Sequence, residues 1–108
     1  MSIILINTRD DLDNLFNNNP DKTIIIKIGA EWCIPCKNIN SLYKQLYTAN
    51  NNINILFTEI NSTDDNNDLI DFLNINSLPT FLFYKNGILI HTIVGSNKLE
   101  ITKYIHKL

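Results

Sequence analysis

The fold is decided by residues 23–37, Thr23-Ile24-Ile25-Ile26-Lys27-Ile28-Gly29-Ala30-Glu31-Trp32-Cys33-Ile34-Pro35-Cys36-Lys37, where an apolar run leads into the chain's two cysteines. Residues 23–28 are apolar and β-branched on both faces apart from Lys27, which is typical of a central strand covered by helices on both sides. Gly29-Ala30 closes this strand. Two cysteines separated by two residues can form a small disulfide ring and reopen it, so the stretch predicts redox chemistry at the end of a central strand.

A helix is expected from Cys36 onward, because apolar residues then recur at helical spacing. These residues are Ile39, Leu42, Tyr43 and Leu46. Pro35 suits the first turn of such a helix, where its missing N–H costs no hydrogen bond. The cysteine pair is therefore predicted to lie where the strand passes into the helix.

This position bears on the chemistry of Cys33. Disulfide exchange requires a thiolate, and a free cysteine with a pKa of ~8.5 supplies little of it at neutral pH. The unpaired N–H groups and the positive end of a helix dipole favour an anion at the helix start. Cys36, one turn further in, should be more buried and less acidic. We therefore predict that Cys33 attacks a substrate disulfide and that Cys36 resolves the mixed disulfide.

Two neighbours are expected to support the pair. Pro35 should stiffen the ring and keep the sulfurs within bonding distance, and Trp32 can shield Cys33 with a flat apolar surface. Ordinary packing of Trp32 is the alternative.

The other segments of the chain alternate between strand and helix patterns. The predicted elements are a strand at residues 3–7, a helix capped by Thr8, a strand at residues 54–61, a helix beginning at Asp64-Asp65, strands at residues 80–85 and 88–94, and a final helix from Lys98. Asn86-Gly87 predicts a hairpin between the last two strands. The order βαβαββα predicts an α/β fold with a central mixed sheet and helices on both faces.

Length and composition limit the possible classes. A chain of 108 residues with 44% hydrophobic residues fits a single domain over residues 1–108 and leaves too little apolar sequence for a membrane span. The net charge of -2 is spread along the chain, so no surface for nucleic acid or anionic lipid is expected. No secretory segment is recognisable at the start, so we expect a cytoplasmic monomer. In that reducing compartment, a lone cysteine pair is catalytic rather than structural.

A metal site is the competing interpretation of the cysteine pair. A structural zinc site needs four ligands, and only His91 and His106 could complete one here. Nothing in the pattern brings these histidines to the cysteines, so we expect no metal and no bound cofactor.

Four motifs in order resemble the thioredoxin family across essentially the whole chain. They are residues 30–37, residues 78–80 (Leu-Pro-Thr), residues 83–87 (Phe-Tyr-Lys-Asn-Gly) and residues 94–95 (Val-Gly). The resemblance implies a thioredoxin fold and a protein disulfide reductase. It also implies a separate electron donor, an NADPH-dependent flavin enzyme of the thioredoxin reductase type.

The resemblance further implies a substrate-docking rim. Pro79 would be cis and face the dithiol, which leaves the backbone of Leu78 free to pair with an extended substrate segment. Gly95 would leave room for that segment. The implied rim consists of Trp32, Leu78, Pro79 and Gly95.

The chain departs from the family pattern at several positions. Ile34 stands where thioredoxins most often carry glycine, which leaves the redox potential open. Asn40 replaces a proline that is usual within this helix, so a straighter helix is expected. Lys27 stands at the position of a buried aspartate thought to move the proton of the second cysteine, and Glu59 stands where a lysine is common.

The exchanged acid and base suggest a hypothesis about proton transfer. Lys27 and Glu59 pair beneath Cys36, Glu59 relays the proton, and Lys27 favours a thiolate. The alternative is that Lys27 points to solvent and Glu59 lies on a separate face.

Two other functions remain open at the level of sequence. One is a thioredoxin-fold binding module that docks a partner without redox turnover, since a fold does not prove a function. The other is an oxidase or isomerase that uses the same exchange chemistry at a different potential.

Overall fold

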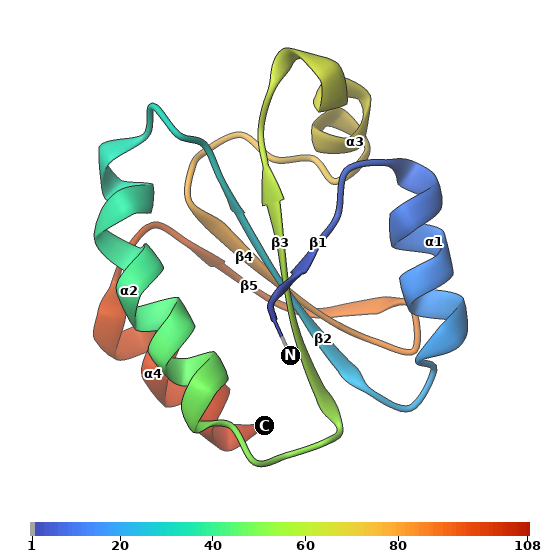
Figure 1. Ribbon diagram of the computed structural model, residues 1–108, viewed down its shortest axis with the longest axis vertical. Coiled ribbons are helices and arrows are strands. Elements are labelled where there is room, and N and C mark those ends of the chain that lie inside the picture. Colours follow the sequence, from blue (N-terminus) through green and yellow to red (C-terminus); the bar gives the residue numbers. More distant parts are fainter. Residues whose placement is uncertain (1) are drawn as a thin grey trace.

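A five-stranded mixed sheet with helices on both faces forms the protein (Figure 1). The computed structural model describes residues 2–108. The elements are β1 (Ile4–Leu5), α1 (Arg9–Asn18), β2 (Thr23–Gly29), α2 (Ile34–Ala49), β3 (Ile55–Asn61), the 3-10 turn η1 (Asp64–Asn66), α3 (Asn67–Phe72), β4 (Thr80–Lys85), β5 (Ile88–Val94) and α4 (Lys98–Lys107). The sheet order is β1-β3-β2-β4-β5. The predicted α/β fold and its mixed sheet are confirmed.

The strand β2 lies at the centre of the sheet. It pairs in parallel with β3 and antiparallel with β4, and residues 24–29 are all buried. The β4–β5 hairpin has the predicted bounds and turns at Asn86-Gly87, both with positive φ. A β-branched strand buried on both faces thus organises the sheet, as its composition predicts.

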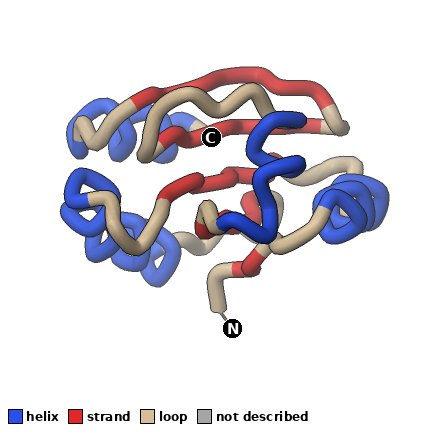
Figure 2. Tube along the Cα trace, turned by 90° about the horizontal axis from the view of Figure 1, so that it is seen from above, coloured by secondary structure: helices blue, strands red, loops and turns tan. Residues whose placement is uncertain are grey.

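Two hydrophobic cores lie on opposite faces of the sheet, beneath the helices that Figure 2 shows on either side of the strands. On one face α2 and α4 pack on β2–β5 through Ile39, Tyr43, Leu46, Ile101 and Ile105. On the other face α1 and α3 contribute Leu12, Leu69 and Leu73. Side chains alternate along β2, so Ile25 joins the first core while Ile24 and Ile26 join the second.

The first strand is shorter than predicted. The strand covers only Ile4–Leu5, with one further backbone hydrogen bond from Ile6 N to Glu59 O, whereas a strand over residues 3–7 was expected. The physical reason lies in the cap of α1, where the side chain of Asp11 accepts the backbone N–H groups of Asn7 and Thr8. The helix cap therefore takes a backbone donor that the strand would have used.

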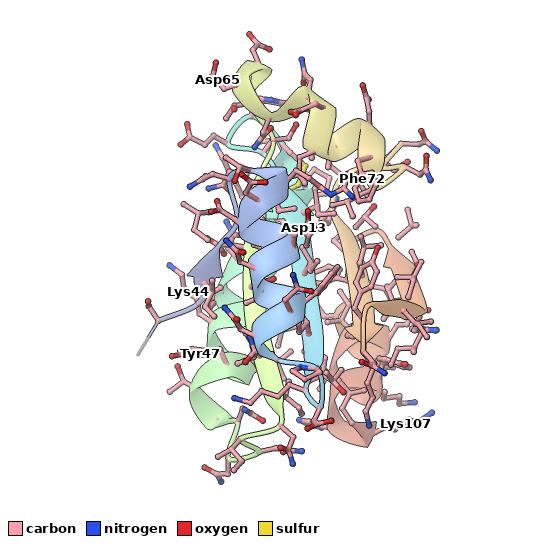
Figure 3. All side chains as sticks on the ribbon, turned by 90° about the vertical axis from the view of Figure 1, so that its right-hand side faces the viewer. Asp13, Lys44, Tyr47, Asp65, Phe72 and Lys107 are labelled. Atoms are coloured by element: carbon pink, nitrogen blue, oxygen red, sulfur yellow. A yellow bond between two sulfur atoms is a disulfide. The ribbon has the colours of Figure 1, made fainter. Side chains whose placement is uncertain are left out.

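The helix expected at Asp64-Asp65 is divided into η1 and α3. Thr63 and Asn66 form a capping box around the tight turn, because the Thr63 hydroxyl accepts from Asp65 N and the Asn66 side chain accepts from Thr63 N. The guanidinium of Arg9 on α1 lies 3.4 Å from the ring centre of Phe72 on α3, and Figure 3 shows Phe72 near the start of α1. This contact ties α3 to α1 beside the sheet.

None of the helices within residues 2–108 combines the length and the apolar character that crossing a bilayer requires.

Replacing Ile25 by alanine should lower the free energy of unfolding by about 2–5 kcal/mol, because a buried side chain is removed from the first core. The matched control is Ile53→Ala, since Ile25 is 0% exposed and Ile53 is 82% exposed. We expect the control to change the free energy by less than about 0.5 kcal/mol in urea denaturation. Equal losses in the two variants would contradict the assigned core.

Candidate active site

Cys33 and Cys36 form a disulfide at the start of α2. Their Cα atoms lie 5.2 Å apart. Cys33 is the N-cap of α2 in extended conformation, and its Sγ accepts a hydrogen bond of 3.2 Å from the backbone N–H of Cys36. Pro35 occupies the first turn, as predicted. A negative charge on the Cys33 sulfur would thus meet a donated N–H and the positive end of the helix.

The two cysteines are buried to nearly the same extent in this oxidised state. Cys33 is 5% exposed and Cys36 is 3% exposed, so the expected difference in burial is small. Both pack in one small cluster with Ala30, against Leu78. Cys33 is not exposed to solvent at the start of α2, because Leu78 packs against the cluster that contains Cys33.

What distinguishes the two cysteines is the cleft that each one faces. Cys33 lines a cleft of about 500 Å³ with Trp32, Ile34, Pro35 and Leu78, and none of its lining residues is charged. Cys36 lines a different cleft of about 540 Å³ that contains three lysines and two glutamates. The disulfide therefore has an uncharged side at Cys33 and a charged side at Cys36.

Two residues of the implied docking rim, Trp32 and Leu78, line the cleft of Cys33, and the other two, Pro79 and Gly95, follow on from Leu78. Trp32 is exposed and shares the Cys33 cleft with Leu78, which is half-buried. The Leu78–Pro79 peptide bond is cis, in agreement with the family pattern. Pro79 itself is buried, and its carbonyl oxygen accepts a 2.8 Å hydrogen bond from Gly95 N. Their role in docking remains a prediction.

The backbone conformation at position 95 favours glycine. Its φ is +100°, a region that other residues rarely adopt, and a Cβ there would meet nothing within 4 Å. The space beside the Pro79–Gly95 contact is therefore open.

Lys27 and Glu59 form an ion pair, and the alternative of a solvent-facing Lys27 is wrong. The two residues are register partners on β2 and β3, and Lys27 Nζ lies 3.5 Å from Glu59 Oε2. The Lys27 side chain is only 8% exposed. It also donates a 2.5 Å hydrogen bond to Asn40 Oδ1 on α2. The proton relay that the hypothesis assigns to Glu59 remains a prediction.

The surroundings of this pair shift two pKa values. Burial lowers the pKa of Lys27, while the charge of Glu59 opposes that shift. Burial and the charge of Glu59 raise the pKa of Tyr43 well above its usual value. The Tyr43 hydroxyl donates to Thr58 O at 2.7 Å, so this side chain stays neutral and anchors α2 to β3.

Four contributors to the site were missed in the sequence. Ile70 and Ile75 line the Cys33 cleft, although neither was considered for the site. Asn40 holds Lys27, although it had been considered only for its effect on helix shape. Gly29 lies beneath Cys36, where a Cβ would come within 3.3 Å of both Cys36 Cβ and Sγ. A glycine directly before the cysteine motif was the one available signal.

The histidines considered for a metal site lie elsewhere in the fold. His91 stacks on Tyr104 with ring centres 4.0 Å apart, and His106 lies in the last turn of α4. Within residues 2–108, no group of three or more histidine, cysteine, aspartate or glutamate side chains is arranged to hold a metal ion.

Comparisons with known proteins assign this arrangement to a family. The family model described as Thioredoxin matches residues 4–107. The chain belongs to the thioredoxin family. Thioredoxin-1 of Caenorhabditis elegans is 34% identical over 97 residues, which cover 90% of this chain and 82% of that protein. Thioredoxin of Ictalurus punctatus is 32% identical over 89 residues, which cover 82% of each chain.

Solved structures agree with the sequence relatives. A crystal structure of Schistosoma mansoni thioredoxin matches with a TM-score of 0.86 and 27% identity, and the match covers 99% of this chain and 95% of that one. Together with the disulfide-forming Cys33–Cys36 pair, family membership makes the chain a thiol-disulfide oxidoreductase of the disulfide reductase type.

Replacing Gly29 by alanine should lower the free energy of unfolding of the reduced protein by about 1–3 kcal/mol, because the added methyl group crowds Cys36. The control is the same change in a Cys36→Ala background, where the sulfur contact is absent. A double-mutant cycle by urea denaturation should give a smaller loss there. An equal loss in both backgrounds would show that the contact with the sulfur is unimportant.

Proposed function

We propose that this chain reduces protein disulfides in the cytoplasm as a monomer, with Cys33 as the attacking and Cys36 as the resolving cysteine. The observation that supports this most strongly is the position of Cys33. Its sulfur accepts a backbone N–H at the start of α2 and lines an uncharged cleft. The backbone N–H stabilises a thiolate on Cys33, and an apolar substrate segment can approach the same sulfur through the cleft.

The proposed cycle has two exchange steps. The Cys33 thiolate attacks a substrate disulfide, so that a Cys33–substrate bond forms and one substrate sulfur leaves. Cys36 then attacks Cys33, which closes the Cys33–Cys36 bond and releases the second substrate sulfur. The substrate gains two electrons, and the two cysteines are oxidised to the observed disulfide.

Docking is proposed to use Trp32, Leu78, Pro79 and Gly95. Trp32 offers an exposed aromatic surface, and Leu78 and Gly95 are partly accessible. Because no charged residue lines the Cys33 cleft, the favoured substrates carry uncharged, apolar residues beside the disulfide.

Electrons must then return to the pair from another protein. The chain has no glycine-rich dinucleotide loop of its own. We propose a separate reductase of the thioredoxin reductase type as the donor, on the strength of family membership. A cytoplasmic location fits this cycle, because a reducing compartment maintains such a pair in its dithiol form.

Activity should depend on the two cysteines in different ways. In an insulin reduction assay with dithiothreitol as donor, Cys33→Ser should lose the activity, because no nucleophile remains. Pre-reduced Cys36→Ser, mixed with insulin after dithiothreitol is removed, should accumulate a mixed disulfide at Cys33, detectable by mass spectrometry, because no second thiol is present to resolve it. Activity that survives in Cys33→Ser would overturn the mechanism, and inactivity of the parent chain would favour a binding module. The redox potential of the Cys33–Cys36 pair, measured by equilibration with glutathione, then distinguishes a reductase from an oxidase or isomerase, because a reductase has the lower potential.

Ile34 should contribute to substrate docking through its exposed side chain. Replacing it by alanine removes apolar surface from the Cys33 cleft, so KM for a protein disulfide should rise about fivefold, equivalent to about 1 kcal/mol of binding. The matched control is Ile88→Ala on β5, since Ile34 is 64% exposed and Ile88 is 65% exposed. Steady-state kinetics should show no change in KM for the control. A parallel rise in both variants would point to a general effect on stability.

A further inference from the structure

The cleft beside Cys36 contains one buried charged side chain, that of Lys27. Its charged lining residues are Lys27, Glu31, Lys37, Lys44 and Glu59. Glu31, Lys37 and Lys44 are exposed, and Figure 3 shows Lys44 at the surface of the molecule. Glu59 is partly exposed, and Lys27 alone is buried. Exposed charges are screened by water and salt, whereas a buried ammonium acts strongly on its neighbours.

The fold places Lys27 against the same surface as Cys36. Lys27 and Gly29 are two residues apart on β2, so the Lys27 side chain lies on the face of the sheet to which a side chain at position 29 would point. A Cβ at Gly29 would lie 3.3 Å from Cys36 Sγ, so Cys36 packs over this glycine. Cys36 and Asn40 are four residues apart on α2 and share one face of the helix. The hydrogen bond from Lys27 to Asn40 therefore joins β2 to α2 one helical turn after Cys36.

Asn40 determines where the ammonium group can lie. Its Oδ1 accepts from Lys27 Nζ at 2.5 Å, and Glu59 Oε2 lies 3.5 Å from the same nitrogen. An amide oxygen fixes the ammonium without cancelling its charge, whereas a carboxylate in its place would neutralise it. Glu59 lies toward solvent and offsets part of the cost of burial.

We propose that Asn40 is a positioning residue of the resolving step, which holds the Lys27 ammonium beside Cys36 so that Cys36 attacks as a thiolate at neutral pH. The proton of Cys36 passes into the cleft, where water and Glu59 can accept it. The thiolate forms the bond to Cys33, the bond from Cys33 to the substrate sulfur breaks, and that sulfur leaves as a thiolate and takes a proton from water. This assignment rests on the exchange cycle proposed above.

The proposal predicts the sign of the effect for each partner of Lys27. Removing the positive charge, or adding a negative one at position 40, should make thiolate formation at Cys36 harder. Removing the negative charge of Glu59 should make it easier. A role in packing alone would not give opposite signs for Lys27 and Glu59.

The experiment follows Cys36 as the single thiol in a Cys33→Ser background. The rate of iodoacetamide labelling of Cys36, measured across pH by mass spectrometry, gives the midpoint of thiolate formation. Lys27→Met should raise this midpoint by about one pH unit, a tenfold loss of thiolate below the midpoint. Asn40→Asp should raise it at least as much, Asn40→Ala should raise it less, and Glu59→Gln should lower it.

The matched control is Lys44→Met, which removes an exposed positive charge from the same cleft. Its midpoint should stay near that of the parent because solvent screens this charge. An unchanged midpoint in Lys27→Met, or a lowered one in Asn40→Asp, would overturn the proposal. Circular dichroism of each variant confirms that it is folded.

The outcome is separable from that of the proposed function. The labelling midpoint is a property of Cys36 itself and can be read even if the chain fails to reduce insulin. Conversely, insulin reduction with unshifted midpoints would keep the reductase and remove the role of Asn40 and Lys27.

Discussion

The packing of α2 against the central strand β2 is the constraint on which the site depends. Gly29 allows Cys36 to approach the strand, and one turn further along the helix Asn40 receives Lys27 from the same strand. Tyr43 completes this contact by donating to Thr58 on the neighbouring β3. Each of these three contacts, at Gly29, Lys27 and Tyr43, requires one particular partner on the other side of the interface. Only one position of α2 on the sheet satisfies all three contacts together.

That position determines the chemistry of both sulfurs. With α2 fixed, its first turn presents the N–H of Cys36 to Cys33, where the proposed cycle develops a negative charge. The strand end, the chain segment at Leu78 and the loop after α3 then surround Cys33 with an uncharged wall. The opposite side of the disulfide stays polar because β2 and β3 bring Lys27 and Glu59 there.

Much of this architecture was predictable because short stretches of sequence determine its strands, helices and turns. The β-branched run of β2, the helical spacing of Ile39 to Leu46 and the Asn86-Gly87 turn each specify their element without distant information. The cysteine pair and its place at the helix start were predicted for the same reason. The misses are long-range: Ile70 and Ile75 line the cleft only after α3 folds back, and Asn40 meets Lys27 across 13 positions of sequence. The short β1 was missed because a helix cap competes for its backbone donor.

The separation of the two clefts has a consequence for how the protein can change over time. The residues proposed for docking lie on the Cys33 side, where Trp32, Ile34, Leu78 and the segment around Ile75 line one cleft. Residues that govern charge beside Cys36 come from β2, β3 and the middle of α2. Since the sets share only the disulfide, mutations in one can accumulate without reshaping the other. Substitutions on the outer walls can therefore change one cleft at a time, whereas a substitution at the α2–β2 interface changes the surroundings of both sulfurs.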